Sequence, residues 1–277
     1  MAFGAWDGST GRRRAANHRN SEEDASHLAA SGRLSYGTHR ITLDPRRSPV
    51  RVSDPTYDTL KRLHSLTGVV PVGAFLLEHF FTNSHALEGA ASYDRAAAFL
   101  ASLPYVTLIE AFGIWLPILF HMGLGILIAA TGQAYLRQRQ YPRYWHYLLQ
   151  RVTGLFLVVF IVFHTWSTRF NPDAMNAPSL YEYVRAHLSH PGIFIFYVLG
   201  VVSACYHLGN GLFGFAIHWG IVTGERAQKR VGQFGLIFAL VLSLVGINAM
   251  LGFLGHGIQI FPRTHVTEAT VAIPGER

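Results

Sequence analysis

The sequence predicts an all-α membrane protein, a bundle of five transmembrane helices with its N-terminus inside and its C-terminus outside. Half of the 277 residues are hydrophobic and only 14% are charged, whereas soluble domains carry about 25% charged residues. Five segments are each apolar over roughly the 20 residues that a bilayer-spanning helix needs. The mean hydropathy of +0.23 agrees with this class.

The five predicted spans follow one another from residue 60 to residue 254. They are Leu66–Phe81 with an amphipathic start from Leu60, Tyr105–Ala130, Leu148–Thr168, Ile193–Trp219 and Phe234–Leu254. Prolines 104, 172 and 191 mark predicted turns or helix starts in the connections. Trp145, Trp166 and Trp219 lie near span ends, as in an aromatic belt at the membrane surface.

Lysine and arginine placement predicts the direction of the spans. With the N-terminus inside, the inner segments carry nine basic residues and the outer segments carry four before the terminal arginine. Cytoplasmic loops are enriched in such residues. The inner set is Lys61, Arg62, Arg137, Arg139, Arg143, Arg151, Arg226, Lys229 and Arg230.

The sequence predicts three regions. Residues 1–53 are a basic, disordered tail, residues 54–256 are the transmembrane domain, and residues 257–277 are a C-terminal tail. The stretch "GRRRAANHRN" resembles a twin-arginine signal, but no apolar segment follows it, so it predicts no targeting. The single cysteine, Cys205, excludes an internal disulfide. No C-x-x-C-H motif is present, so the sequence predicts no covalently attached haem.

Four of the 15 histidines lie well inside the spans, where a polar side chain is costly and usually functional. His79, His121, His164 and His207 fall on the first four spans in order. Depth along the helices pairs His79 with His164 toward the outer side, and His121 with His207 toward the inner side. A hydrogen bond to a neighbouring helix is the alternative for any one of them.

The two inner histidines begin the same motif, H-x-G-x-G, read as "HMGLG" and "HLGNG". Gly125 and Gly211 lie one helical turn after their histidines on the same face. Two interpretations are open: the glycines clear space beside each imidazole for a large flat group, or they allow close packing of helices.

A facing pair of imidazoles suits some groups better than others. Zinc normally takes four ligands, and proton relays use carboxylates, whereas the only acids within the spans are Glu78 and Glu110, neither of them deep. A b-type haem takes two axial nitrogens from opposite sides, which leaves no open position and suits electron transfer. Two such haems at different depths would form an electron path across the bilayer.

At this point the residues resemble a known family, the single-subunit, five-helix diheme cytochrome b anchor of succinate:quinone oxidoreductases. The motifs are "KRLHSLTGVVPVGAFLLEH", "SLPY", "LPILFHMGLGILIA", "LLQRVTGLFLVVFIVFHTW", "GVVSACYHLGNGLFGFAIHWGI" and "GERAQKR". They extend from about Tyr57 to Leu254. Other classes fit less well: a haem-free anchor predicts loss of the histidines, and a transporter predicts inverted repeats.

The resemblance implies an electron-transfer subunit in the bacterial cytoplasmic membrane, with two b haems ligated as the depth argument pairs them. It also implies two soluble partners on the cytoplasmic face, a flavoprotein with covalent FAD and an iron–sulfur protein. Electrons from succinate would pass to a quinone, often menaquinone, and this chain would hold no dicarboxylate chemistry. The same subunit in a fumarate reductase, or a diheme cytochrome of another respiratory dehydrogenase, is the alternative.

Haem propionates need cations or hydroxyls at the membrane edge. Near the inner face the candidates are Arg62, His64, Ser65, Arg143 and Arg151, and near the outer face Thr168 and Arg169. His64 is expected at the cytoplasmic edge, in a propionate or docking contact. Each arginine has an alternative interpretation as an ordinary positive-inside or snorkelling charge. For quinone-side proton transfer, the resemblance points to the loop before the second span, where Asp94 is the candidate and Glu88 the other acid.

Overall fold

The computed structural model describes residues 39–41, 50–52, 54–131 and 142–259. The chain divides into two compact units, Met1–Thr56 and Tyr57–Arg277. In the first unit, β1 (His39–Ile41) and β2 (Val50–Val52) form an antiparallel hairpin that pairs Arg40 with Arg51. Apart from these two strands, the N-terminal tail that is predicted to be disordered lies outside the described residues. Most of the C-terminal tail also lies outside them.

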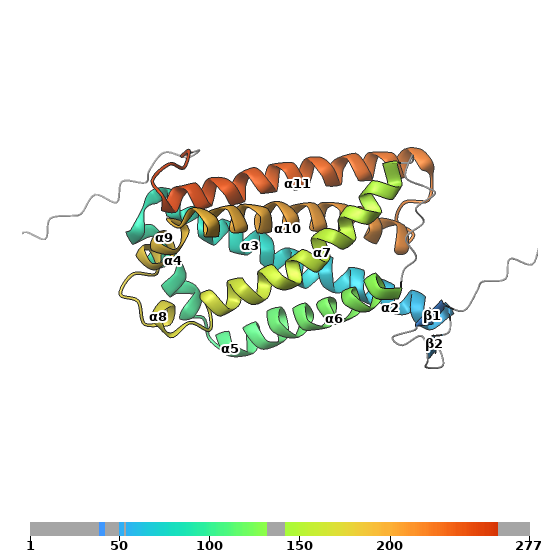
Figure 1. Ribbon diagram of the computed structural model, residues 1–277, viewed down its shortest axis with the longest axis horizontal. Helices are drawn as coiled ribbons and strands as arrows, with labels where there is room; N and C mark the ends of the chain where they lie inside the picture. The colour runs from blue at the N-terminus through green and yellow to red at the C-terminus, as the bar shows by residue number, and fades with distance from the viewer. Residues whose placement is uncertain (1–38, 42–49, 53, 132–141, 260–277) are drawn as a thin grey trace, which may run out of the picture. The chain divides into compact units, whose positions relative to one another are not determined.

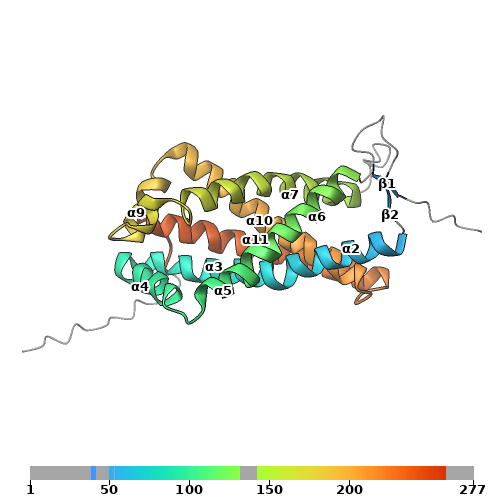
Figure 2. The ribbon, with the colours of Figure 1, turned by 90° about the horizontal axis from the view of Figure 1, so that it is seen from below.

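The second unit contains five helices that are long and apolar enough to cross a membrane, among the residues described. They cover Asp58–Glu88, Val106–Ala130, Tyr144–Ser167, Pro191–His218 and Glu225–Phe253. The predicted five-helix membrane fold is therefore confirmed. Figures 1 and 2 show these helices running along one another as a bundle.

Each of the first two spans consists of several helical segments. Each contains one π-helical turn, with a proline inside it or shortly after it. Span one contains α2 (Asp54–Thr67), a π-helical η1 (Gly68–Val72) with Pro71 inside it, and α3 (Gly73–Ser84). Span two contains α5 (Val106–Ile109), a π-helical η3 (Glu110–Trp115) and α6 (Leu116–Thr131), in which Pro117 is the second residue. Proline lacks the N–H that an α-helix uses, and a local π turn accommodates the interruption.

The other three spans are continuous helices. They are α7 (Pro142–Ser167), α10 (Pro191–His218) and α11 (Glu225–Phe253). The helix of the fifth span begins earlier than the predicted Phe234, because α11 starts at Glu225, directly after Gly224. Glu225 in the first turn is favourable for the helix dipole, which explains why a charged segment continues the helix.

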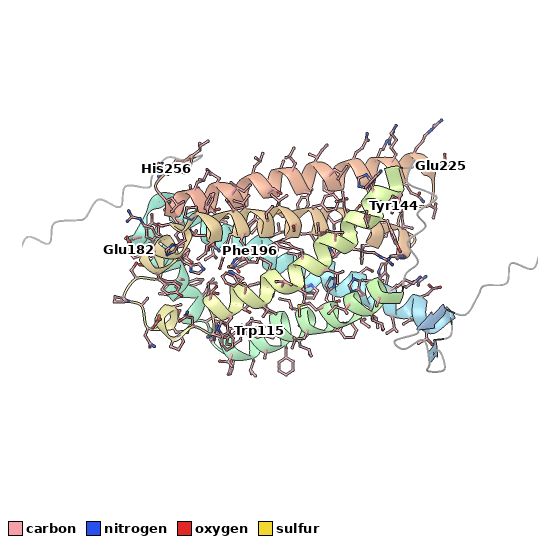
Figure 3. All side chains as sticks on the ribbon, in the orientation of Figure 1. Trp115, Tyr144, Glu182, Phe196, Glu225 and His256 are labelled. Atoms are coloured by element: carbon pink, nitrogen blue, oxygen red, sulfur yellow. The ribbon has the colours of Figure 1, made fainter. Side chains whose placement is uncertain are left out.

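Short helices occupy the connections at one end of the bundle. They are η2 (His85–Glu88), α4 (Ala90–Ala101), α8 (Pro172–Met175) and α9 (Leu180–Leu188). Gly89, with φ of 98°, separates η2 from α4. Figure 3 shows Glu182 and His256 at this end and Tyr144 and Glu225 at the opposite end. We call the two ends the Glu182 end and the Glu225 end.

The core lies toward the Glu182 end, where α3, α4, α9, α10 and α11 meet. It contains Phe80, Tyr93, Tyr181, Tyr197, Cys205 and Phe253, among others. Helices α10 and α11 lie side by side along their length (Figure 1). Gly209 and Gly235 allow this approach, because a Cβ on either would meet the backbone carbonyl of the other. Small residues often mediate such helix contacts in membranes.

Many large apolar side chains point away from the bundle, as expected of helices surrounded by lipid. Phe81, Phe112, Val159 and Ile237 are all more than 60% exposed. Trp166 is 73% exposed near the end of α7, which suits the predicted aromatic belt. A surface this apolar is suited to lipid contact and would be unstable in water.

Candidate functional site

The four in-span histidines form two facing pairs. His79 on α3 and His164 on α7 have ring centres 5.7 Å apart with ring planes at 81°. His121 on α6 and His207 on α10 have ring centres 6.1 Å apart with planes at 85°. We call them the 79/164 pair, toward the Glu182 end, and the 121/207 pair, toward the Glu225 end. These are the pairings that the depth argument predicts.

Both imidazoles of the 121/207 pair are held by backbone carbonyls of facing helices. The Nδ1 of His121 donates to the carbonyl oxygen of His64 at 2.9 Å, and the Nδ1 of His207 donates to that of Gln150 at 3.1 Å. The hydroxyl of Thr153 lies 3.3 Å from the same Nδ1 of His207. A carbonyl can only accept, so each Nδ1 carries a proton and each Nε2 keeps its lone pair. This is the tautomer that a metal ligand bonding through Nε2 requires.

His64 lies against the 121/207 pair. Its ring stacks on that of His121, with centres 3.9 Å apart and planes at 14°. Its Nδ1 donates to the backbone carbonyl of His121 at 3.1 Å. The propionate or docking contact expected of His64 stays a prediction; in the structure its imidazole is turned toward the bundle and bonded to α6.

Gln150 holds His207 in the same way as His64 holds His121, through a side-chain hydrogen bond to the backbone carbonyl. Its Nε2 donates to the carbonyl of His207 at 3.1 Å, and its Oε1 accepts from Asn210 at 2.8 Å. Gln150 was not among the residues predicted from the sequence. The available signal was an echo between "HSLTG" and "QRVTG", in which Gln150 and Gly154 each follow His64 and Gly68 by 86 residues.

The glycines of the H-x-G-x-G motifs have a different role from the first interpretation. A Cβ on Gly125 would lie 3.1 Å from Cε1 of His64, and one on Gly211 would lie 3.7 Å from Nε2 of Gln150. The missing side chain of Gly125 therefore makes room for His64 on the facing helix, whereas a Cβ on Gly211 would make an ordinary contact with Gln150.

Two other glycines lie directly against the imidazoles. A Cβ on Gly68 would overlap the ring of His121, and one on Gly154 would lie 2.9 Å from Cε1 of His207. Neither glycine belongs to an H-x-G-x-G motif. These two positions, and not Gly125 and Gly211, give the rings of the 121/207 pair their space.

The 79/164 pair lies in a more aromatic environment. Phe160 lies nearly parallel to His164, with centres 5.7 Å apart and planes at 8°. The Nδ1 of His164 lies 3.3 Å from the hydroxyl of Tyr197, which also contacts the hydroxyl of Ser167 at 3.3 Å. The ring of Phe75 lies 5.5 Å from that of His79. An imidazole whose Nδ1 is engaged by a neighbour is again oriented for bonding through Nε2.

The residues present fit two bis-histidine haems. A histidine nitrogen binds a transition metal at about 2 Å, so two axial imidazoles have ring centres about 6 Å apart, near the spacings of both pairs. Within the described parts of the chain, no group of three or more His, Cys, Asp or Glu side chains could hold a metal ion.

Two of the four arginine candidates for propionate binding, Arg169 and Arg151, have protein partners. Arg169 forms an ion pair with Glu110 through two contacts, at 2.9 and 3.3 Å. Arg151 lies over the ring of Tyr147, 4.2 Å from its centroid, and donates to the carbonyl of Ile128. Arg62 is exposed, and the side chain of Arg143 lies outside the described residues.

The hydroxyl candidates bond to nearby groups. Ser65 donates to the carbonyl of Arg62 at 2.9 Å and accepts from the indole of Trp219 at 3.3 Å. Thr168 donates to the carbonyl of His164 at 2.6 Å. Ser65 therefore links the first span to the end of α10, and Thr168 caps a carbonyl near the end of α7.

The acids proposed for the loop before the second span lie in or beside helices. Asp94 lies in α4 and accepts a hydrogen bond from the backbone N–H of Tyr181 at 2.9 Å, at the start of α9. Glu88 accepts from Ser92 at 2.8 Å. Burial and the nearby charge of Asp94 raise the pKa of Tyr93 to about 12. The connection before the second span is thus largely helical, and Asp94 ties two of its short helices together.

Comparison with known proteins identifies the family of this chain. Residues 133–246 match the model of the succinate dehydrogenase/fumarate reductase transmembrane subunit family. The chain is also 40% identical to the succinate dehydrogenase cytochrome b558 subunit of Bacillus subtilis (strain 168), over 193 residues. That alignment covers 70% of this chain and 95% of the relative. The chain belongs to the family of cytochrome b membrane subunits of succinate dehydrogenase and fumarate reductase.

Membership of this cytochrome b family identifies the chain as a membrane subunit of an oxidoreductase complex. The five apolar helices agree with a multi-pass protein of a bacterial cytoplasmic membrane. The family resemblance noted from the sequence motifs is thus confirmed at this level.

Proposed function

We propose that this subunit binds two b haems, one between His79 and His164 and one between His121 and His207, and conducts electrons between an iron–sulfur partner and membrane quinone. The observation that carries the proposal is the pair of facing imidazole sites at two depths, with ring centres 5.7 and 6.1 Å apart. When bound, a bis-histidine haem supplies one-electron transfer.

The chain's own groups hold and orient the ligand nitrogens. Backbone carbonyls of His64 and Gln150 fix the rings of the 121/207 pair, and Tyr197 engages His164. Phe160, Phe156 and Phe196 pack together beside the 79/164 pair and keep water away from it. Fixed orientation and a dry surrounding are the protein's main means of tuning such a centre.

The Glu225 end is proposed to face the cytoplasm. It carries Arg226, Lys229 and Arg230 at the start of α11, and Lys61 and Arg62 on α2, as the positive-inside rule requires. A flavoprotein with covalent FAD and an iron–sulfur protein would dock there, so that this chain performs electron transfer and quinone chemistry and no dicarboxylate chemistry. The same site serves succinate oxidation or fumarate reduction.

Quinone, of which menaquinone is the expected type, is proposed to react at the Glu182 end, beside the 79/164 pair. Asp94 is the predicted proton-transfer residue there. Its carboxylate also caps α9, so its effects on proton transfer and on stability have to be measured separately.

Haem content and redox titration test the proposal. Pyridine haemochrome analysis of the purified complex should give two b haems per chain, with two separate midpoints. His164→Ala should remove one haem and His121→Ala the other, while His190→Ala, at an exposed position, keeps both. A colourless protein, or loss of both haems from either ligand variant, would contradict the two independent sites.

A further inference from the structure

The 121/207 pair is held by two matching sets of reciprocal hydrogen bonds. His64 accepts from His121 through its backbone carbonyl and donates back to the carbonyl of His121 through its side chain, at 2.9 and 3.1 Å. Gln150 accepts from His207 and donates to the carbonyl of His207, both at 3.1 Å. In each set the partners are 57 residues apart in the chain.

A glycine lies one turn after each ligand, and at Gly125 it leaves the ligand's carbonyl accessible to the facing side chain. A helical carbonyl already accepts from the N–H four residues later, which is Gly125 for His121 and Gly211 for His207. A second donor can reach that oxygen only past the side chain at this position. With a Cβ on Gly125 only 3.1 Å from Cε1 of His64, even alanine would crowd the bond.

Each set therefore fixes a ligand at two points. One bond holds the imidazole through Nδ1, and the other holds the backbone of the same residue, so neither the ring nor the helix that carries it can rotate freely. Partners of this kind set both the orientation and the basicity of a ligating histidine.

We propose that His64 and Gln150 are positioning residues for the haem between His121 and His207. This inference rests on the proposed haem binding and adds two residues that bind no iron themselves. Their side chains are interchangeable in principle, because both supply one N–H donor to a ligand's backbone carbonyl. His64 adds a ring stacked on His121, and Gln150 is held by Asn210.

Side-chain replacement removes only one of the two bonds, since the backbone carbonyl remains. His64→Leu should therefore loosen the site without emptying it: about tenfold weaker haem retention, the lower limit for loss of such a partner. The ferric low-spin signal in electron paramagnetic resonance and the midpoint of the 121/207 haem should shift. The signal and midpoint of the 79/164 haem should stay unchanged.

His64→Gln is the decisive comparison, because it installs the residue that the other set already uses. It should restore haem retention and most of the spectral position that His64→Leu loses. Gln150→Leu should shift the same haem and serves as the second variant if His64→Leu does not assemble. Leu63→Ala, at a 39% exposed neighbouring position, is the control.

The outcomes separate this inference from the proposed function. A wild-type complex without haem overturns both. A wild-type complex with two haems, whose His64→Leu and Gln150→Leu variants keep wild-type spectra and haem retention, overturns the positioning role alone. Failure of His64→Gln to recover any signal would show that the donor to the carbonyl is not what matters, which also overturns it.

Discussion

Arg169 and Glu110 form a two-contact ion pair that joins the residues following α7 to the start of η3, 59 residues away in the chain. The side chains are 45% and 26% exposed, and the pair lies at the edge of predicted spans. Arg169 is predicted from the sequence to contact a haem propionate. Its ion pair with Glu110 suggests a second, structural role, and the two roles predict different effects of substitution.

If the ion pair is the main role, Arg169→Gln and Glu110→Gln should destabilise the complex by similar small amounts. The double variant should be less than additive by about 0.5 kcal/mol, as for partly exposed pairs. Thermal unfolding of the four proteins measures this coupling. A shift in the midpoint of the 79/164 haem in Arg169→Gln, absent from Glu110→Gln, would favour the propionate contact instead.

Asp94 should reveal its role through the contrast between asparagine and alanine. Asparagine keeps the oxygen that accepts from the N–H of Tyr181, so Asp94→Asn should keep near wild-type stability, whereas Asp94→Ala should lose about 1 kcal/mol, as for a lost cap. Proton transfer needs the ionisable group. Quinone reduction that falls in Asp94→Asn at unchanged unfolding temperature would support the proton-transfer prediction, and full activity would contradict it.

Gly68 should be intolerant of any side chain. Its Cβ would overlap the ring of His121, so Gly68→Ala should displace this ligand and reduce binding of the 121/207 haem while the 79/164 haem remains. Haem content and the reduced-minus-oxidised spectrum measure the effect. Gly123→Ala is the matched control, because no atom lies within 4 Å of its Cβ although it is two residues from His121. Equal effects of the two substitutions would contradict the packing argument.

His187 on α9 should make the protein less stable in acid. Its Nε2 is buried and has no hydrogen-bond partner among the residues that the structure describes. Burial lowers the pKa of this imidazole, with a smaller contribution from His190. An unfolded histidine titrates near pH 6.5, so below that pH the unfolded state binds more protons and stability falls; above it both states are neutral and the contribution vanishes.

His187→Leu should therefore raise the unfolding temperature relative to wild type more at pH 5.5 than at pH 7.5. The apolar replacement keeps a side chain beside Phe163 and Tyr197, which His187 contacts. The exposed His256, which does not affect the pKa of His187, serves as the control when it is replaced by leucine. A stability difference of the same size at both pH values would exclude titration of His187 as the cause.

Hydropathy was sufficient to locate all five spans, because the bilayer sets both the length and the polarity of a spanning helix. It was insufficient where helices continue into polar sequence. The start of α11 at Glu225 and the helices α4 and α9 lie in segments whose charges resemble those of loops. Their helicity depends on caps such as the hydroxyl of Ser179, which accepts from the N–H of Glu182.

The histidine pairs were predictable because depth follows from the constant rise of a helix. The surroundings of each ring were not, since they depend on rotation about the helix axis and on which neighbour each face meets. The contacts of Gly68 with His121, and of Gly125 with His64, required coordinates. The shared T-G dipeptides at Thr67 and Thr153 were visible in the sequence but have no meaning until the helices are paired.

The π-helical turn at Gly68–Val72 lies between His64 and His79. It changes the direction in which His79 points from the helix relative to His64. In span one, His64, whose side chain donates to a ligand's carbonyl, precedes the outer ligand His79. This separation is one residue longer than the separation of Gln150 from His164 in α7. In an α-helix one extra residue turns everything after it by about 100°, which would point His79 away from His164. The wide turn absorbs that residue, so the first span serves both pairs from one helix. Removing one residue within this turn should be tolerated by the outer pair, whereas removing one from α3 before His79 should separate its ligands.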